Sequence, residues 1–342
     1  PSSFYLQASV LERERRAVFG STWQLAGRAE QVATPGQYFT TTVGHEPLLI
    51  VRGSDGELRA LSNVCRHRAG PVARGEGKRP ILQCGYHGWT YSLEGRLLTT
   101  PEFEGVHCFD RQEMSLPSFR VESWNGLLFV QLDPAAPSLS EFFGDLSEHL
   151  PARDVTGFTV AARKEWELEC NWKVYVDNYL EGYHIPIVHP GLFREIDYQN
   201  YRTETRAHYS IQHAPLRNPE RIPVDGGDPE AQYFWIYPNL MLNVYPDNFS
   251  TNLIVPLSPT RTLTIFEWYF RDAQQPQVLK RVEETVAFSD EIQLEDIAIC
   301  EAVQRGLRSS TYHRGRYSPS RENGVHHFHD LYAQAMGIER RS

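Results

Sequence analysis

The chain has 342 residues and a formal net charge of −9, with 41% hydrophobic and 23% charged residues. This composition is ordinary for a folded protein of about two domains, and the negative charge argues against nucleic acid or a membrane surface as a partner. No apolar run approaches the roughly 18 residues of a membrane span, and the first twenty residues lack the pattern of a signal peptide. Five unevenly spaced cysteines do not suggest a disulfide scaffold, so we expect a reducing, cytoplasmic compartment.

The elements expected along the chain change character near residue 135. Before it, short β-rich runs separated by Gly, Pro, Asn and Asp predict a small antiparallel domain. After it, strands and helices are mixed. The expected elements are a charged helix at 8–20, β-rich runs at 23–133, a linker at 133–143, strands at 236–246, 250–257 and 261–270, and one long helix at 275–306. We therefore expect an α+β protein with a β domain at 22–135 and a larger domain built from 1–21 and 136–342.

Two cysteines and two histidines lie in two tight pairs, Cys65 with His67 and Cys84 with His87. Three interpretations compete. The four residues are buried structural groups, or a tetrahedral Cys₂His₂ zinc site, or a Rieske [2Fe–2S] cluster in which the cysteines hold one iron and the histidines the other. Zinc fingers group Cys with Cys and His with His, whereas each pair here offers one of each. The spacing therefore favours the Rieske cluster.

A second candidate site lies at 171–191, where His184 and His189 are five residues apart. Pro186 between them breaks a helix, so they are not the i, i+4 pair of a zinc-protease helix. Two imidazoles and one carboxylate would form the facial triad that holds non-haem Fe(II) and leaves room for O₂ and substrate. Two histidines that are only hydrogen-bonded in the core are the simpler alternative.

The long helix at 275–306 supplies the candidate carboxylates Asp290, Glu291, Glu295 and Asp296. Asp296 falls at helical spacing on an apolar stripe with Ile292, Ile299 and Val303. An isolated buried carboxylate is costly, so an acid on this stripe should bind a metal or an ion-pair partner. The pattern selects Asp296 and gives Glu295 no part in the site. A local salt bridge is the alternative for Asp296.

Both stretches resemble the oxygenase (alpha) subunits of Rieske non-haem iron oxygenases. The first has the form C-x-H-x16-C-x-x-H followed by Gly-Trp, the second reads NWK…DNYLEGYH…H, and EDIAICEAVQRGL is similar to the carboxylate-bearing helix of that family. The resemblance covers nearly the whole chain and implies a Rieske β domain beside a helix-grip catalytic domain of the START-like type. It implies a [2Fe–2S] cluster on the two Cys–His pairs and a mononuclear Fe(II) on His184, His189 and Asp296.

The resemblance also implies how electrons travel. In the family the two metal centres of one subunit are too far apart for fast transfer, so we expect a homotrimer in which the cluster of one subunit faces the iron of the next. Glu181 would bridge His184 and His87 of the partner subunit, unless it is an ordinary surface acid, and Asn178 would orient this bridge or cap a helix. The chain has no nucleotide fingerprint, so electrons from NAD(P)H would come through a separate flavin or iron–sulfur reductase or a ferredoxin.

Within the family, the segments NVCRHRAG and YPNLMLNVYPDNFSTNLIVPL resemble choline monooxygenases and related oxygenases of quaternary ammonium compounds such as betaine and carnitine. Aromatic faces hold a trimethylammonium group well, and we expect Trp235, Tyr237 and Asn243 to line the substrate pocket. The expected reaction is the O₂-dependent hydroxylation or oxidative demethylation of a small quaternary ammonium compound. An arene or aryl-ether substrate would suit the same lining. A Rieske-type electron-transfer protein without oxygenase activity and a zinc-stabilised binding protein are the alternatives of other classes.

Overall fold

The computed structural model describes residues 1–150, 157–217 and 230–338. The chain divides into two compact units, one of Arg15–Phe142 and the other of Pro1–Glu14 with Phe143–Ser342. The sheets of both units are antiparallel and helices accompany them, so the expected α+β class is confirmed. These compact units meet at residues 15 and 142, and the domain boundaries expected at 22 and 135 stay a prediction. No helix in the described part of the chain is both long and apolar enough to cross a membrane.

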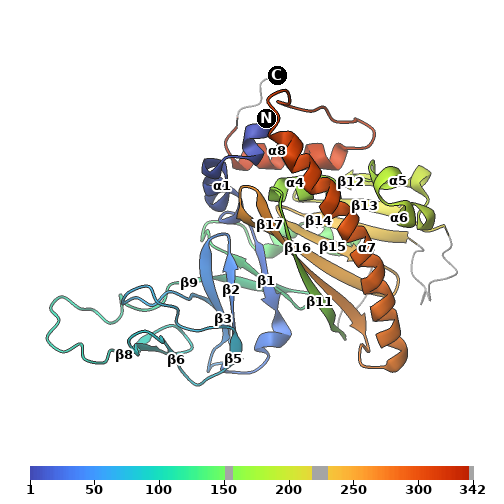
Figure 1. The fold of residues 1–342 in the computed structure, drawn as a ribbon. Coiled ribbons are helices and arrows are strands. Elements are labelled where there is room, and N and C mark those ends of the chain that lie inside the picture. Colours follow the sequence, from blue (N-terminus) through green and yellow to red (C-terminus); the bar gives the residue numbers. More distant parts are fainter. Residues whose placement is uncertain (151–156, 218–229, 339–342) are drawn as a thin grey trace. The chain divides into compact units, whose positions relative to one another are not determined.

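The unit Arg15–Phe142 contains one seven-stranded sheet in the order β1-β10-β9-β4-β3-β2-β5 and a small sheet of β6, β7 and β8 (Figure 1). The strands are β1 (Gln24–Arg28), β2 (Gln37–Val43), β3 (Glu46–Arg52), β4 (Leu58–Ser62), β5 (Glu76–Lys78), β6 (Leu82–Gln83), β7 (Thr90–Tyr91), β8 (Leu97–Thr99), β9 (Ser118–Trp124) and β10 (Leu127–Gln131). Short helical turns lie at η2 (Arg15–Phe19) and η3 (Ala29–Val32). The expected linker contains a helix, α2 (Leu139–Phe143).

Strand β3, which lies between β4 and β2, is apolar from Leu48 to Val51 because both of its faces are covered. Leu48 and Ile50 pack into one core cluster, whereas Leu49 and Val51 pack into a second cluster on the other face. The second cluster also contains Cys65. The sheet therefore serves as a platform on which the Cys–His loops rest.

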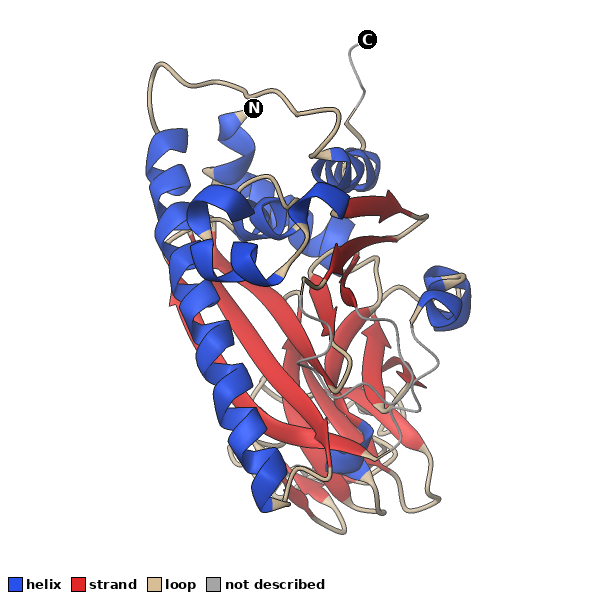
Figure 2. Cartoon of the chain, turned by 90° about the vertical axis from the view of Figure 1, so that its right-hand side faces the viewer, coloured by secondary structure: helices blue, strands red, loops and turns tan. Residues whose placement is uncertain are grey.

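The second unit is built on a seven-stranded sheet in the order β11-β17-β16-β15-β14-β13-β12. Its strands are β11 (Phe158–Leu168), β12 (Arg202–Thr205), β13 (Tyr209–Pro215), β14 (Glu230–Ile236), β15 (Leu240–Val244), β16 (Asn248–Ser258) and β17 (Arg261–Arg271). Its helices are η1 (Ser2–Tyr5), α1 (Ala8–Glu14), α3 (Leu146–His149), α4 (Trp172–Tyr179), α5 (Ile185–Val188), α6 (Pro190–Glu195), η4 (Tyr198–Asn200), α7 (Pro276–Leu307) and α8 (Asn323–Ala335). The long helix α7 runs along one face of the sheet (Figures 1 and 2). Of the strand expected at 236–246, Leu240–Val244 forms β15, whereas Ile236 ends β14 before a turn at 237–239.

The buried side of α7 differs from the predicted stripe. Ile299 and Val303 are 37% and 44% exposed, so that part of the prediction is wrong. Gln293 and Gln304 are buried instead, because Gln293 hydrogen-bonds to Tyr175 and Gln304 Oε1 accepts a hydrogen bond from a backbone N–H. Satisfied amides thus occupy positions that a hydrophobicity pattern assigns to apolar residues. The full buried side is Val278, Val282, Val286, Gln293, Cys300, Gln304 and Leu307.

Candidate metal centres and substrate cavity

The two Cys–His loops of the unit Arg15–Phe142 lie against each other. The first is closed by a 2.8 Å hydrogen bond from the N–H of Cys65 to the carbonyl of Gly70. Gly70 is needed where the loops meet, because a Cβ atom there would stand 3.2 Å from Cys84 Sγ. Both cysteines are buried, while the rings of His67 and His87 lie nearer the surface with centroids 4.6 Å apart. Thiolates inside and imidazoles outside suit a cluster whose inner iron takes Cys and whose outer iron takes His.

The surroundings of the loops also fit a bound cluster. His67 Nδ1 is buried and has no hydrogen-bond partner, which is costly unless the atom binds a metal. The ring of His67 stacks on Trp89, with centroids 4.8 Å apart and an interplanar angle of 7°. Tyr91 places its hydroxyl 3.2 Å from Cys65 Sγ, where its O–H can donate to the sulfur and tune a reduction potential. The residues present therefore fit a [2Fe–2S] group.

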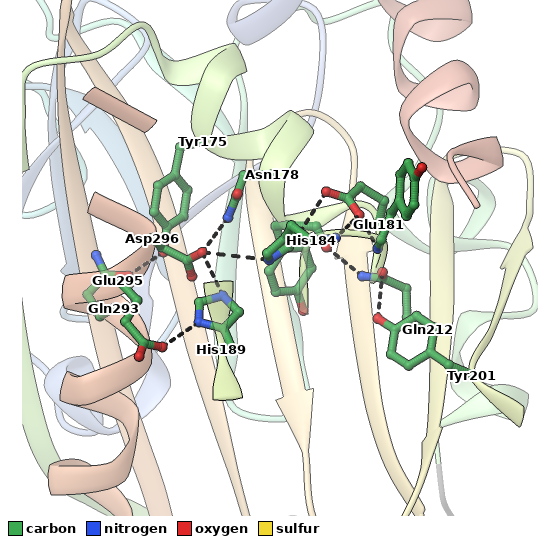
Figure 3. Close-up of polar contacts among 12 residues, drawn as sticks. Tyr175, Asn178, Glu181, His184, His189, Tyr201, Gln212, Gln293, Glu295 and Asp296 are labelled. Carbon is green, nitrogen blue, oxygen red and sulfur yellow. Dashed lines mark hydrogen bonds and ion pairs between the residues drawn. The ribbon is translucent and has the colours of Figure 1, made fainter. Parts of the chain in front are cut away.

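In the second unit the structure brings His184, His189 and Asp296 together (Figure 3). One ligand atom from each lies within 4.8 Å of the others. Asp296 Oδ1 is 3.0 Å from His189 Nε2 and 3.8 Å from His184 Nε2. Local sequence explains the positions of the two imidazoles, because His184 precedes the one-turn helix α5 and His189 precedes Pro190 at the start of α6. The open arrangement of two imidazoles and one carboxylate matches a facial triad for Fe(II).

Each imidazole is backed by a glutamate (Figure 3). His184 Nδ1 is 2.6 Å from Glu181 Oε1, and His189 Nδ1 is 2.7 Å from Glu295 Oε2. An ionised carboxylate only accepts, so both Nδ1 atoms carry the hydrogen and both Nε2 lone pairs are left for a metal. Burial lowers the pKa of His189, but the hydrogen bonds and charges of Asp296 and Glu295 outweigh it, and the pKa lies above its ordinary value.

Two residues near the triad differ from their sequence-based roles. Asn178 Nδ2 donates a 2.6 Å hydrogen bond to Asp296 Oδ1, so Asn178 orients the carboxylate and not the Glu181 contact. Glu295, which the apolar stripe excluded from the site, contacts His189. The sequence offered one signal, which is that Glu295 directly precedes Asp296. Consecutive helix residues point in directions about 100° apart, so a long side chain at 295 can reach a group that lies against Asp296.

A cavity of about 530 Å³ extends from the triad between α7 and the sheet. Its floor includes five residues that are neighbours across five successive strands, β13 to β17. This row is Gln212, Tyr233, Asn243, Ser250 and Trp268. Alternate residues of a strand share a face, so the polar and aromatic members of the row follow from strand parity and register.

Four tyrosines of the cavity wall lie together in one cluster: Tyr179, Tyr201, Tyr233 and Tyr245. The rings of Tyr233 and Tyr245 stand edge to face, 6.0 Å apart. Tyr179 donates a 2.9 Å hydrogen bond to Asn243 Oδ1, and burial raises the pKa of its hydroxyl. Among the described residues, the wall also carries five carboxylates and one guanidinium, which are Glu181, Glu195, Asp247, Glu284, Asp296 and Arg281. The cavity is therefore aromatic and predominantly acidic.

Of the three residues expected to line the pocket, Asn243 does so and Trp235 and Tyr237 do not. Trp235 points to the same face of β14 as Tyr233 but lies two residues further along the strand. There it packs edge to face against Phe328 of α8, with ring centroids 5.4 Å apart. The parity of the strand was readable from the sequence, whereas the place where helices cover it was not.

Comparison with known proteins assigns each part of the chain to a family. Residues 22–110 match the family described as Rieske [2Fe-2S] domain, and residues 156–338 match the family described as Ring hydroxylating alpha subunit (catalytic domain). The fold and the two sites thus define the oxygenase component of a Rieske non-haem iron system. The chain belongs to the ring-hydroxylating alpha-subunit family. Its cofactors are a Rieske cluster and a mononuclear iron, it uses O₂, and a separate reductase supplies its electrons.

Similar proteins include the chloroplastic choline monooxygenase of Arabidopsis thaliana, which is 34% identical over 97% of this chain and 81% of its own length. The carnitine monooxygenase oxygenase subunit of Escherichia coli is 31% identical over 98% of this chain and 93% of its own length. The crystal structure of the quaternary ammonium Rieske monooxygenase CntA with an inhibitor superposes with a TM-score of 0.87 at 31% identity, covering 98% of this chain and 94% of that chain.

Proposed function

We propose that this chain is a monooxygenase of small quaternary ammonium compounds. The observation that carries the proposal is the aromatic, acidic cavity that opens onto the His184–His189–Asp296 triad. Aromatic faces and carboxylates both attract a cation that cannot donate a hydrogen bond. The tyrosine hydroxyls are neutral at physiological pH, and burial raises the pKa of residues such as Tyr201 further. Similar proteins are named for choline and carnitine, and CntA structures contain L-carnitine and gamma-butyrobetaine.

In this proposal the unit Arg15–Phe142 carries electrons and the other unit carries out the chemistry. Cys65, Cys84, His67 and His87 hold the cluster. His184, His189 and Asp296 hold the ferrous iron, which when bound activates O₂ beside the substrate. The chain's own task is positional, because the tyrosine wall fixes the cationic group and Asn178 holds the Asp296 carboxylate.

We further propose that electrons pass between subunits of a homotrimer, from His87 of the partner subunit through Glu181 to His184. Glu181 already holds His184, and its Oε2 accepts hydrogen bonds from the backbone N–H groups of Tyr183 and His184. Large exposed apolar side chains adjoin both ends of the path. Tyr183 and Ile187 flank His184 and are 57% and 86% exposed, and Tyr86 precedes His87 and is 57% exposed. Such neighbouring apolar surface supports a protein interface at each end.

The inter-subunit path has a direct test by complementation. One variant, Cys84→Ala, lacks the cluster and keeps the iron site, and another, Asp296→Ala, keeps the cluster and lacks the iron site. Each is expected to be inactive alone. Co-expressed, they should form mixed trimers that recover part of the activity, since an intact cluster then faces an intact iron. Mixed trimers without any activity would mean that electrons travel within one subunit.

The substrate class is tested by matched pairs of compounds with a reconstituted reductase. Choline and carnitine should be turned over, whereas their carbon isosteres, in which an uncharged C(CH₃)₃ group replaces the cationic N(CH₃)₃ group, should show a higher KM. Replacing Tyr233 by Leu should raise KM for the cation by a factor corresponding to about 0.5–2 kcal/mol and leave the isostere unaffected. Hydroxylation of an arene or demethylation of an aryl ether, with no activity on the amines, would favour the alternative substrate class. Cluster reduction without any O₂-dependent product would favour a pure electron carrier.

We also propose a cytoplasmic location. All five cysteines are free of disulfides, and two of them are the proposed thiolate ligands. Thiolates and ferrous iron persist in a reducing compartment. Cell fractionation with an antibody to the chain tests this directly.

A further inference from the structure

His189 is the most enclosed member of the triad, yet the segment that carries it is weakly packed. Its side chain is 2% exposed, whereas α5, which leads to it, is a single turn of four residues with only Ile185 buried. Ile187, in the middle of that turn, is 86% exposed. One turn of helix with one buried residue provides little of the packing that fixes a side-chain orientation. Another group must therefore hold the imidazole.

Glu295, which lies on helix α7, holds the imidazole in place. Its Oε2 is 2.7 Å from His189 Nδ1, and Asp296 Oδ1 is 3.0 Å from Nε2 of the same ring. The two acids are adjacent on α7, a helix of 32 residues packed along the sheet. The ring therefore lies between consecutive residues of a rigid element, with Glu295 holding Nδ1 and Asp296 on the metal-facing side of Nε2 (Figure 3).

We propose that Glu295 is a positioning residue of the mononuclear iron site, which fixes the ring plane of His189 and keeps its hydrogen on Nδ1. The inference rests on the iron-binding role proposed above for His189 and Asp296. A carboxylate behind a ligand histidine sets the tautomer and strengthens the metal-facing nitrogen, and its loss commonly weakens metal binding by about 10–100-fold. Glu295 differs from Glu181 in this respect, because Glu181 lies in the same loop as its histidine and is proposed to face another subunit.

The test measures iron binding and not turnover. Chelator-treated protein with its cluster intact is titrated with Fe(II) without oxygen, and bound iron is determined by metal analysis. Glu295→Ala should raise the dissociation constant about 10–100-fold. Glu295→Gln keeps an acceptor oxygen for Nδ1–H and should fall between Ala and the unsubstituted protein. Glu283→Ala is the matched control, since it removes an exposed acid from the same helix and should change nothing.

Two further measurements separate a loss of iron binding from a loss of folding. Cluster absorption and the melting temperature report whether a variant is folded. If Glu295→Ala is not folded, the test relies on Glu295→Gln. In that variant the EPR signal of nitric oxide bound at the ferrous site should shift, because an amide oxygen accepts a hydrogen bond more weakly than a carboxylate oxygen. Fe(II) binding by Glu295→Ala as tight as in the unsubstituted protein, or an unshifted signal in Glu295→Gln, overturns the inference. If Asp296→Ala also keeps its iron, the proposed iron site itself is wrong.

Discussion

The two candidate metal centres of this chain are assembled over very different distances in the sequence. The four Cys and His residues of the unit Arg15–Phe142 lie between positions 65 and 87, on two loops that rest on one sheet. The three residues of the other centre lie between positions 184 and 296 and come from a loop–helix segment and from α7. The first centre is therefore a local motif of the unit Arg15–Phe142, which we call the Rieske unit. The second exists only once the other unit, which we call the catalytic unit, is folded. This difference predicts that the two centres are lost independently and for different reasons.

The largest expected effect breaks the local motif alone. Cys65→Ala or Cys84→Ala removes one of the two buried thiolates, and a Rieske cluster cannot form on three ligands. We expect complete loss of cluster absorption and of NAD(P)H-coupled turnover, while iron at the second centre is retained. Visible absorption and iron analysis check this. A variant with an intact cluster spectrum would show that these loops do not hold the cluster.

The corresponding change in the second centre is Asp296→Ala. It removes the only carboxylate among the three proposed ligands, so we expect loss of the mononuclear iron and of product formation. The cluster should keep its spectrum and still accept electrons from the reductase, because its residues belong to the other unit. Metal analysis together with stopped-flow cluster reduction measures both properties. Loss of the cluster as well would contradict the independence of the two centres.

What could be read from the sequence follows the same division. The Cys–His pairs were interpretable from spacing alone, since short loops fix their own geometry. His184, His189 and Asp296 were found by family resemblance together with a stripe argument that was wrong for Ile299 and Val303. The contact of Glu295 with His189 and the grouping of the four tyrosines escaped prediction, because side chains that meet through tertiary packing leave no periodic signal.

Trp235 also shows what sequence patterns do not predict. Its strand and its face were predictable by alternation. Its burial under α8 was not, because no pattern in β14 records which helix covers which part of the sheet. Sequence patterns therefore gave the direction of this side chain, and only the fold gave its neighbours.

The catalytic unit also depends on a buried ion pair that the Rieske unit does not share. Lys173, 1% exposed, pairs with the buried Glu14, which also accepts hydrogen bonds from Trp172 Nε1 at 2.9 Å and Tyr332 OH at 2.5 Å. These contacts join α1, α4 and α8. Burial lowers the pKa of Lys173, but the charge of Glu14 opposes that shift.

Lys173→Met leaves the Glu14 carboxylate buried without its cation. We expect the catalytic unit to lose about 3–5 kcal/mol of stability, while the cluster loops are spared. Urea unfolding is followed by tryptophan fluorescence, which reports both units, and by cluster absorption, which reports the unit Arg15–Phe142 alone. The double variant Glu14→Gln/Lys173→Met should recover much of the loss, because it removes both charges. A single variant as stable as the unsubstituted protein would mean that the pair is not needed.

The smallest expected effect concerns Glu181, the residue proposed to connect the two kinds of centre. Its carboxylate holds His184 Nδ1 at 2.6 Å, and in the proposed trimer its other side faces His87 of the partner subunit. Glu181→Gln keeps the size and one acceptor oxygen, so His184 should stay in place and both metals should remain bound. The variant loses the negative charge and the second acceptor, so only one of the two imidazoles can still be held through an oxygen. Electron transfer between subunits should therefore slow, and activity should fall by about 10–100-fold.

A single-turnover experiment isolates this step. The cluster of Glu181→Gln is reduced first, then mixed with substrate and O₂, and its reoxidation is followed with product formation. Glu181→Asp, which keeps the charge but shortens the arm by one methylene, should be slowed as well unless the backbone adjusts. The two glutamates behind the triad then separate by phenotype: Glu181 variants hold iron and transfer electrons slowly, whereas Glu295 variants bind iron weakly. If the cluster of Glu181→Gln is reoxidised at the rate of the unsubstituted protein, Glu181 only positions His184. Electrons would then pass from the cluster to the mononuclear iron by another path.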